Sequence, residues 1–399
     1  MTFSSSNSFS YHSRNRSLLP GENRSLLPGE DTSSKMQKEQ ENILRKFECD
    51  YIFEPNYNKS LSDNPSKLKK MRRNIRLKTY VDSSKYEGEI QNDIRSGKGI
   101  YYYANGDKYL GDWKQDKFDG RGVYIFSNNE RYEGELKKGL KHGYGVYFYL
   151  NGNKYEGEWM NDKKNGRGTY YNFCTNERYE GTWLDGEKHG KGVYEYSYSD
   201  KYIGDWKTGL KHGEGTLYYS NGSTLQGTWY EDYIQGEAVF KYNNGDVYEG
   251  NYMKGLKCNF GKYMFCDGSV YEGMWNIDEK NGKGVFYYTN GDRYEGDWLD
   301  GERHGYGVYY FASGEVYEGG WWKEKKQGKG KISFNDGDAY DGDWRDGIKD
   351  GMGVYRFANG DVYEGEFKEG KKEGEGKYKT NSGKIINGVW KDDKLVKED

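Results

Sequence analysis

The segment YEGELKKGLKHGYGVYFYLNGNK, residues 132–154, holds the pattern that decides the fold. With Tyr132 taken as position 0, positions 0 to 4 alternate between Tyr132 and Gly134 on one side and glutamates on the other. This alternation is typical of a half-buried β-strand. After a polar link, glycine and tyrosine alternate over residues 143–149 as a second strand, and Asn-Gly at 151–152 predicts a tight turn. The segment therefore predicts two strands and two turns.

The same pattern returns as a series of units along most of the chain. Tyr occupies position 0 in twelve of fourteen units, and Trp occupies position 4 in ten of them. The period is 23 residues with a single step of 24, which indicates a tandem-repeat architecture. Such an array buries its core between neighbouring units and offers surface rather than a deep pocket, which argues against an enzyme. The position-2 glycines are Gly88, Gly111, Gly134, Gly157, Gly181, Gly204, Gly227, Gly250, Gly273, Gly296, Gly319, Gly342, Gly365 and Gly388.

The glycines have a predicted packing role. Positions 11 and 13 are each Gly in twelve of thirteen units, with Asn259 and Ala238 as the exceptions. A glycine on the same face as aromatic rings leaves a trough that a neighbouring ring can fill. We therefore assign the repeated aromatic and glycine positions to a structural core. Its representative members are Tyr132, Gly134, Tyr155, Gly157, Trp159, Tyr179, Trp183, Tyr202, Trp206, Tyr294, Trp298, Tyr340 and Trp344.

The composition agrees with an aromatic rather than an aliphatic core. Only 33% of residues are hydrophobic, which would normally suggest disorder, but the chain has 42 Tyr and 11 Trp, whose rings bury large areas. No proline follows Pro65, as expected for an uninterrupted sheet. The predicted fold is all-β: an elongated single-layer antiparallel β-sheet solenoid of about 14 hairpins. Some 27 strands spaced ~4.8 Å apart would give a ribbon about 130 Å long.

Three segments are expected along the chain. Residues 1–32 form a disordered low-complexity tail that contains NRSLLPGE twice in tandem. Residues 33–82 form a leader with two short helices, over 33–48 and 64–79. Residues 83–399 form the array, whose last unit, 386–399, is half a repeat and serves as a cap. Residues 1–85 carry a net charge of +6 (16 basic, 10 acidic), and the remaining residues carry −9 (45 basic, 54 acidic).

The second leader helix is strongly basic, which makes it a candidate for docking. It could dock onto an acidic protein surface, lie on an anionic membrane, bind nucleic acid, or be a solvated linker. Protein docking is favoured, anionic lipid stays open, and no nucleic acid is expected. The basic residues are Lys67, Lys69, Lys70, Arg72, Arg73, Arg76 and Lys78.

Groups that could do chemistry follow the repeat and do not stand apart from it. Four of the five histidines, His142, His189, His212 and His304, occupy position 10 of their units. Equivalent positions lie two strands apart, ~9–10 Å, which is too far for ligands of one metal ion. Repeated acidic residues at position 1 indicate a solvated face, because an active site needs one differentiated pair. We expect no catalytic residue, no cofactor and no metal.

These residues resemble the MORN repeat, a pattern of Tyr-x-Gly-x-Trp, Gly-x-Gly and an Asn-Gly-Asp turn. Here they read Tyr155-Glu-Gly157-Glu-Trp159, Gly166-Arg-Gly168 and Asn290-Gly291-Asp292. The resemblance covers about 315 of the 399 residues. It implies an elongated single-layer antiparallel sheet of the kind found in membrane junctions, basal cytoskeletal structures and radial spoke heads of cilia. Some members add a lipid kinase or SET domain, and nothing in this chain matches either.

The resemblance implies a cytoplasmic, non-catalytic scaffold or protein-interaction ribbon in a cytoskeletal or ciliary assembly, axonemal and radial-spoke-like. Its partners would be other proteins of a large assembly, with a homodimer through the array ends or face as an option. Two alternatives stay open. One is an adaptor that targets phosphoinositides or other anionic lipids through the leader. The other is a regulatory subunit of an enzyme such as a lipid kinase.

Overall fold

The computed structural model describes residues 38, 41–42 and 75–398. The chain divides into two units, residues 1–74 and 75–399. In the first, residues 38, 41 and 42 are helical, inside the stretch 33–48 where a helix was expected. The predictions for the tail 1–32 and for the leader up to residue 74 otherwise lie outside the described residues. They include the basic side chains of Lys67, Lys69, Lys70, Arg72 and Arg73.

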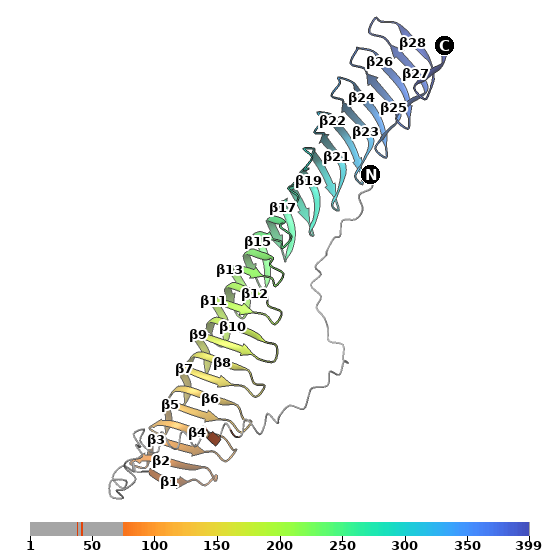
Figure 1. The fold of residues 1–399 in the computed structure, drawn as a ribbon. Coiled ribbons are helices and arrows are strands. Elements are labelled where there is room, and N and C mark those ends of the chain that lie inside the picture. The colour runs from red at the N-terminus through yellow and green to blue at the C-terminus, as the bar shows by residue number, and fades with distance from the viewer. Residues whose placement is uncertain (1–37, 39–40, 43–74, 399) are drawn as a thin grey trace, which may run out of the picture. The chain divides into compact units, whose positions relative to one another are not determined.

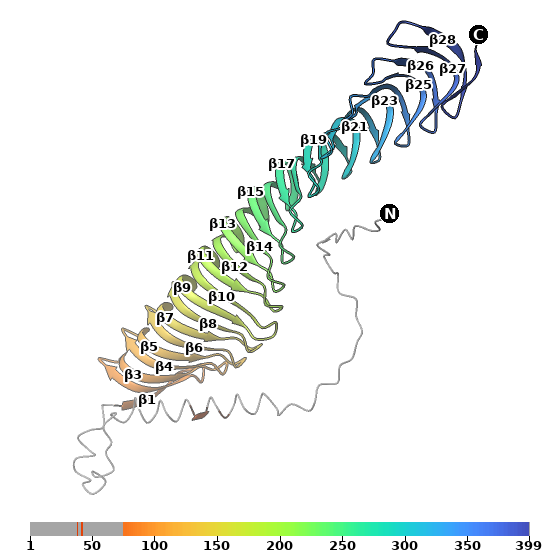
Figure 2. The same ribbon diagram turned by 45° about the horizontal axis from the view of Figure 1, so that its top comes forward.

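The second unit is one open antiparallel sheet of 29 strands, which confirms the predicted fold class. Figures 1 and 2 show the strands stacked in chain order, each curved and each beside its neighbours in sequence. Residues 75–398 contain no helix. The strands are β1 (Ile75–Thr79), β2 (Lys85–Gln91), β3 (Ile94–Tyr102), β4 (Lys108–Lys114), β5 (Lys117–Ile125), β6 (Arg131–Lys137), β7 (Leu140–Phe148), β8 (Lys154–Met160), β9 (Lys163–Asn172), β10 (Glu177–Leu184), β11 (Glu187–Glu195), β12 (Lys201–Lys207), β13 (Leu210–Tyr218), β14 (Thr224–Tyr230), β15 (Tyr233–Lys241), β16 (Val247–Met253), β17 (Leu256–Met264), β18 (Val270–Asn276), β19 (Glu279–Tyr287), β20 (Arg293–Leu299), β21 (Glu302–Tyr310), β22 (Val316–Trp322), β23 (Lys325–Ser333), β24 (Ala339–Arg345), β25 (Ile348–Arg356), β26 (Val362–Lys368), β27 (Lys371–Lys379), β28 (Ile385–Lys391) and β29 (Lys394–Glu398).

The sheet begins earlier than the sequence suggested. The basic helix expected over 64–79 is wrong for its last five residues, because Ile75–Thr79 forms β1 and pairs with β2. Lys78 stands opposite Tyr86. In the other units the residue opposite the position-0 tyrosine is position 15 of the preceding unit, so β1 takes the place of a preceding second strand. The open edge of β2 offers backbone hydrogen bonds to β1, and these outweigh the helical spacing of the apolar residues. The last unit, expected as half a repeat, forms the short hairpin β28–β29.

The register aligns the glycines of successive strands. Within one unit, Tyr132 of β6 stands opposite Tyr147 of β7, and Gly134 stands opposite Gly145. Between units, Gly145 stands opposite Gly157 of β8. Positions 2 and 13 therefore form a continuous glycine row across the sheet. A bulge follows position 2 in the pairing of β6 with β7, and the same holds in the other units except the last, where it follows Val389 at position 3.

Each unit closes with two turns at opposite ends of its strands. The link after position 5 is a two-residue turn with both residues at positive φ, as at Asn161 (51°) and Asp162 (68°). These angles define a type I′ hairpin, whose twist matches that of the flanking strands. In half of the units the second turn residue is Gly and in the others it is Asp or Glu. At the other end, Gly152 donates its N–H to the carbonyl of Tyr149 at 3.0 Å in the expected Asn-Gly turn.

Candidate functional site

The position-0 tyrosines lie in the trough that the glycine row leaves. Tyr132 is fully buried and donates its Oη hydrogen to the carbonyl of Glu135 at 2.7 Å. A Cβ added to Gly134 would lie 2.5 Å from the Cα of Gly145 and 2.6 Å from the Tyr132 hydroxyl. Only glycine therefore fits beneath the ring. Twelve tyrosines share this full burial: Tyr86, Tyr109, Tyr132, Tyr155, Tyr179, Tyr202, Tyr248, Tyr271, Tyr294, Tyr317, Tyr340 and Tyr363.

The position-4 residues join one unit to the next. The ring of Trp159 packs edge to face on Tyr155 of its own unit and on Tyr132 of the preceding unit. The ring centroids lie 5.1 Å and 5.5 Å apart, respectively. Its Nε1 donates to the carbonyl of Gly145 at 3.2 Å. Tyr and Trp thus alternate in a stack on what we call the aromatic face, interrupted where Ile90, Leu136 and Leu225 replace an aromatic residue. Trp183, Trp206, Trp298 and Trp344 occupy the same place and are buried.

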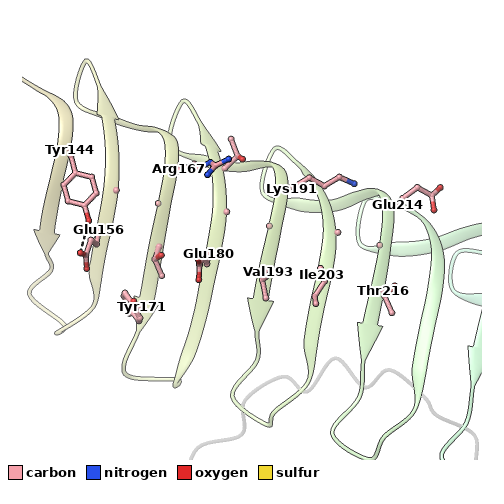
Figure 3. A pocket seen from close by; sticks show the side chains of 18 of the residues that line it. Tyr144, Glu156, Arg167, Tyr171, Glu180, Lys191, Val193, Ile203, Glu214 and Thr216 are labelled. Carbon is pink, nitrogen blue, oxygen red and sulfur yellow. Dashed lines mark hydrogen bonds between the residues drawn. The ribbon is translucent and has the colours of Figure 1, made fainter.

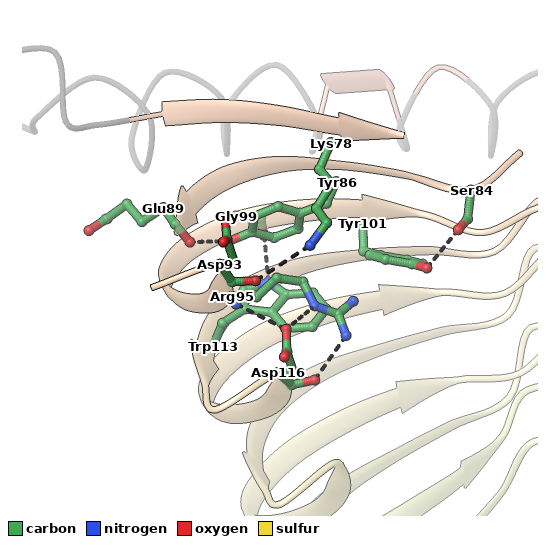
Figure 4. A network of polar contacts seen from close by, with 10 residues as sticks. All are labelled: Lys78, Ser84, Tyr86, Glu89, Asp93, Arg95, Gly99, Tyr101, Trp113 and Asp116. Carbon is green, nitrogen blue, oxygen red and sulfur yellow. Dashed lines mark hydrogen bonds and ion pairs between the residues drawn. The ribbon is translucent and has the colours of Figure 1, made fainter. Parts of the chain in front are cut away.

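A row of cations covers this stack at position 9, and the sequence analysis missed it. The Nζ of Lys280 lies 4.1 Å from the ring centroid of Trp298 and 5.6 Å from that of Tyr271. Figure 4 shows Arg95 in the equivalent place, beside Tyr86 and Trp113. The signal was the regular basic residue two positions before the position-11 glycine. The cation row consists of Arg95, Lys141, Lys164, Lys188, Lys211, Lys257, Lys280, Arg303, Lys326, Lys349 and Lys372.

The type I′ hairpin of the next unit decides the surroundings of each cation. Where that hairpin carries an acid, a carboxylate lies near the cation, and in three units the two form an ion pair, as Arg95 and Asp116 do at 2.8 Å. Where the hairpin carries glycine instead, as it does with Gly301 beside Lys280, no carboxylate on the hairpin compensates for the water that the buried ammonium group loses. Burial against the rings lowers the pKa of Lys280 to about 8. Burial gives the same value for three other lysines that face a glycine hairpin: Lys164, Lys188 and Lys326.

Carboxylates at the far end of the strands tie several loops to the next. Asp246 accepts a hydrogen bond from Tyr263 Oη at 2.7 Å and another from the backbone N–H of Cys266 at 2.8 Å. Burial acts to raise the pKa of Asp246, but its hydrogen bonds outweigh burial and hold the pKa below its usual value. The same tie joins Tyr124 to Asp107, Tyr147 to Glu130, Tyr309 to Asp292, Tyr355 to Asp338 and Tyr378 to Asp361.

The face opposite the aromatic stack carries a shallow groove of about 850 Å³ (Figure 3). Its floor is the glycine row, and its lining side chains include Tyr144, Arg167 and Lys191. Tyr144 donates its Oη hydrogen to Glu156 at 2.9 Å, and Lys191 pairs with Asp205 at 2.8 Å. These polar groups engage one another across units, so the groove presents alternating charge.

The position-10 histidines are spread along the array. The ring of His304 packs on Trp322 of the next unit at 4.4 Å, and His212 packs on Tyr230 at 5.2 Å. Within the part of the chain that the structure describes, no three His, Cys, Asp or Glu side chains gather where they could hold a metal ion.

Of the basic docking candidates, Arg76 and Lys78 lie in β1, and Lys78 Nζ approaches the carbonyl of Asp93 at 3.4 Å. No helix among the described residues has the length and apolar character needed to cross a membrane.

The sequence profile of the MORN repeat matches thirteen successive stretches of the chain, which cover most of residues 86–385. They are 86–108, 109–131, 132–154, 155–172, 179–197, 202–224, 226–247, 248–270, 271–293, 294–316, 317–339, 340–362 and 363–385. The chain belongs to the MORN-repeat family. The MORN array is thus a repeat protein with an open sheet, an architecture of scaffolds and interaction surfaces rather than of enzymes.

Other comparisons add little to the MORN assignment. No curated protein matches the chain. The SAS-4 (dCPAP) TCP domain of Drosophila melanogaster, in complex with a proline-rich motif of Ana2, is 13% identical, covering 44% of this chain and 90% of that one, with a TM-score of 0.27. The TCP10 domain of Danio rerio CPAP, in complex with a STIL peptide, is 14% identical, covering 71% and 99%, with a TM-score of 0.23. These scores are too low for the likeness to carry an argument.

Proposed function

We propose that the MORN array is a non-catalytic scaffold: a ribbon that holds partner proteins in a cytoskeletal or ciliary assembly of the axonemal or radial-spoke kind. The carrying observation is that side chains able to do chemistry are used, unit after unit, in the same internal contacts. Tyr132 holds the carbonyl of Glu135, and Asp246 holds Tyr263 and the next loop. Repeated equivalent groups do not separate into an acid and a base, as a catalytic pair must.

The regular spacing of the units supports a role in positioning. Each unit adds two strands, so equivalent side chains on successive units lie ~9–10 Å apart. A partner that contacts several units is therefore held at multiples of that distance. Because nine of the eleven Trp side chains donate to a carbonyl of the preceding unit, as Trp159 does to Gly145, neighbouring units are fixed to one another. This coupling favours a stable spacing along the ribbon.

We extend the proposal to the basic leader, which would tether the ribbon to an acidic protein surface. Arg76 and Lys78 carry this basic character onto β1, the first strand of the sheet. Replacing the seven leader cations with glutamine, from Lys67 to Lys78, is expected to release the protein from its assembly while the sheet stays folded. Retention of the variant after salt extraction, equal to that of the wild type, would exclude the tether.

Localisation tests the scaffold most directly. A tagged full-length protein, expressed in its own cell type, is expected to concentrate on an axonemal, basal or cortical structure and to stay with the detergent-insoluble cytoskeleton. A uniform cytosolic signal with complete detergent extraction would contradict the proposal. Colocalisation with a membrane that detergent removes would favour the anionic-lipid adaptor instead.

A further inference from the structure

Two neighbouring hairpins of the array expose more apolar surface than the others. Positions 5 and 8 face each other beside each type I′ turn, on the face opposite the aromatic stack. In the described units these pairs contain at least one polar or charged residue, except in two units. Tyr230 pairs with Tyr233, and Met253 pairs with Leu256, each of them 41–58% exposed. Figure 1 places their strands, β14 to β17, in the green middle of the array.

A second departure adjoins the first. Position 12 of one unit faces position 3 of the next, and this pairing is usually charged or polar, as between Lys283 and Asp297 at 2.7 Å. Between β17 and β18 the pair is Phe260 and Met274 instead. Both side chains are exposed, Phe260 by 58%. Within residues 75–398 this is the one pairing of its kind with an apolar side chain on both strands.

The surface around these residues carries more carboxylates than ammonium groups. Position 12 is Lys or Arg in six units, but Glu237 occupies it in β15, beside the two hairpins. Glu231 lies in the turn between Tyr230 and Tyr233, and Glu279 begins β19 on the other side. None of these three glutamates forms an ion pair with another described residue. Lys254 lies in the turn between Met253 and Leu256, so three unpaired carboxylates beside the apolar residues outnumber this one lysine.

We propose that Tyr230, Tyr233, Met253, Leu256, Phe260 and Met274, here called the apolar patch, dock a cationic amphipathic helix of a partner protein; this rests on the proposed scaffold function. Exposed apolar residues that gather in one place mark interaction sites, whereas single ones are ordinary. The patch crosses five adjacent strands, β14 to β18, which span ~19 Å. A helix covers that distance in about 13 residues.

The acidic surroundings select the charge of the occupant. Basic residues along the edges of the helix would meet Glu231, Glu237 and Glu279, while its apolar face covers the patch. Two copies of the chain meeting through the patch would instead bring these carboxylates face to face. The headgroups of an anionic membrane would be repelled by the same carboxylates. The charges therefore favour a cationic protein segment over a second copy or a lipid surface.

Binding of defined peptides to the full chain tests the proposal. The probe is a fluorescent 14-residue helical peptide of leucine and lysine, with leucine on one face, and its partner probe carries glutamate at every lysine. The patch variant is Met253→Ser with Leu256→Ser and Phe260→Ser. The matched control, Leu184→Ser with Leu299→Ser and Ile348→Ser, removes three exposed apolar residues from single positions elsewhere on the same edge.

Anisotropy titrations are expected to show at least tenfold weaker binding of the lysine peptide by the patch variant and less than twofold change in the control. Glu237→Gln with Glu279→Gln should weaken binding several-fold and reduce its dependence on salt. The single variant Phe260→Lys, on an exposed side chain, gives a second measure that does not depend on the triple variant remaining folded. Circular dichroism confirms that each variant is folded.

Three results would overturn the proposal. The patch and control variants could bind the peptide equally, the glutamate peptide could bind as tightly as the lysine peptide, or the patch variant could lower the sedimenting mass of the chain, which would identify a second copy. The scaffold function fails separately, through a diffuse wild-type protein in cells. A localised wild type whose patch variant binds peptide normally would remove this inference and leave the scaffold standing.

Discussion

Tyr109 lies directly over Gly122: a Cβ at residue 122 would come within 2.5 Å of both the ring and the hydroxyl oxygen of that tyrosine. The backbone at Gly122 does not have positive φ, so its conformation would accept other residues. The ring alone excludes them. The one unit with Ala at this position, Ala238, also has Leu225 in place of the tyrosine. Leucine and alanine therefore replace tyrosine and glycine together, as a matched pair.

Gly122→Ala is expected to destabilise β4 and β5 by about 1–3 kcal/mol, because the added methyl overpacks the trough. The double variant Tyr109→Leu with Gly122→Ala copies the natural pair and should cost less than the sum of the two single changes. Hydrogen exchange of the amides in β4 and β5 measures the local opening free energy. Additive single effects would show that the ring is not the obstacle.

Tyr132→Phe is expected to cost about 1–3 kcal/mol, because it leaves the part-buried carbonyl of Glu135 without its 2.7 Å hydrogen bond. Tyr144→Phe serves as the control, since Tyr144 donates to Glu156 in an exposed place. That change should stay within about 0.5 kcal/mol. Thermal melting of the two variants compares them, and equal melting temperatures would count against a structural role for the buried hydroxyl.

Stability is expected to rise as pH increases from about 8 toward 10. The pKa of Lys280 is about 8 in the folded chain, and a free lysine has a pKa of about 10.4. Between these values the unfolded chain holds more protons, so raising the pH favours the folded state. Above about pH 10 the buried tyrosines lower the stability as pH rises. Burial raises the pKa of Tyr363 to about 12, so the folded chain then holds more protons than the unfolded chain.

Lys280→Met should therefore raise the melting temperature at pH 7 and reduce the gain seen between pH 7.5 and 9.5. Lys257→Met is the comparison, because Asp278 on the adjoining hairpin partly offsets the burial of Lys257. Its effect should be smaller. Identical pH profiles for the wild type and Lys280→Met would show that this ammonium group is better solvated than its position among the rings indicates.

Asp246→Ser is expected to loosen the loop around Cys266, because Tyr263 loses its acceptor. The double variant Asp246→Ser with Tyr263→Phe should be less damaging, since it copies the arrangement of Ser223 and Phe240 in the preceding unit. Because hydrogen bonds hold the pKa of Asp246 below its ordinary value, the wild-type contribution is present above about pH 4 and falls away in acid. Melting at pH 7 and pH 3 tests both statements.

The sheet and its aromatic core were predictable because they follow short, local rules. Alternation along residues 132–136 gives a strand, and the 23-residue period places every copy in register. The cation row was not predicted, because the contact of Lys280 with Trp298 joins residues 18 positions apart and depends on the strand register. In sequence alone such lysines resemble solvated charges. β1 was missed for a related reason: its pairing partner, not its own residues, decides its conformation.

Each strand of the array pairs only with its neighbours in sequence. Force or heat can therefore separate one strand pair while the other pairs stay formed. Tension between the two ends would pull along the interstrand hydrogen bonds, which lie perpendicular to the strands, and would open the pairs in succession. The ribbon would lengthen in steps of one unit and leave the units on either side intact. Optical tweezers would record this as a regular series of small extensions. A ribbon of this kind can serve as an extensible link as well as a spacer.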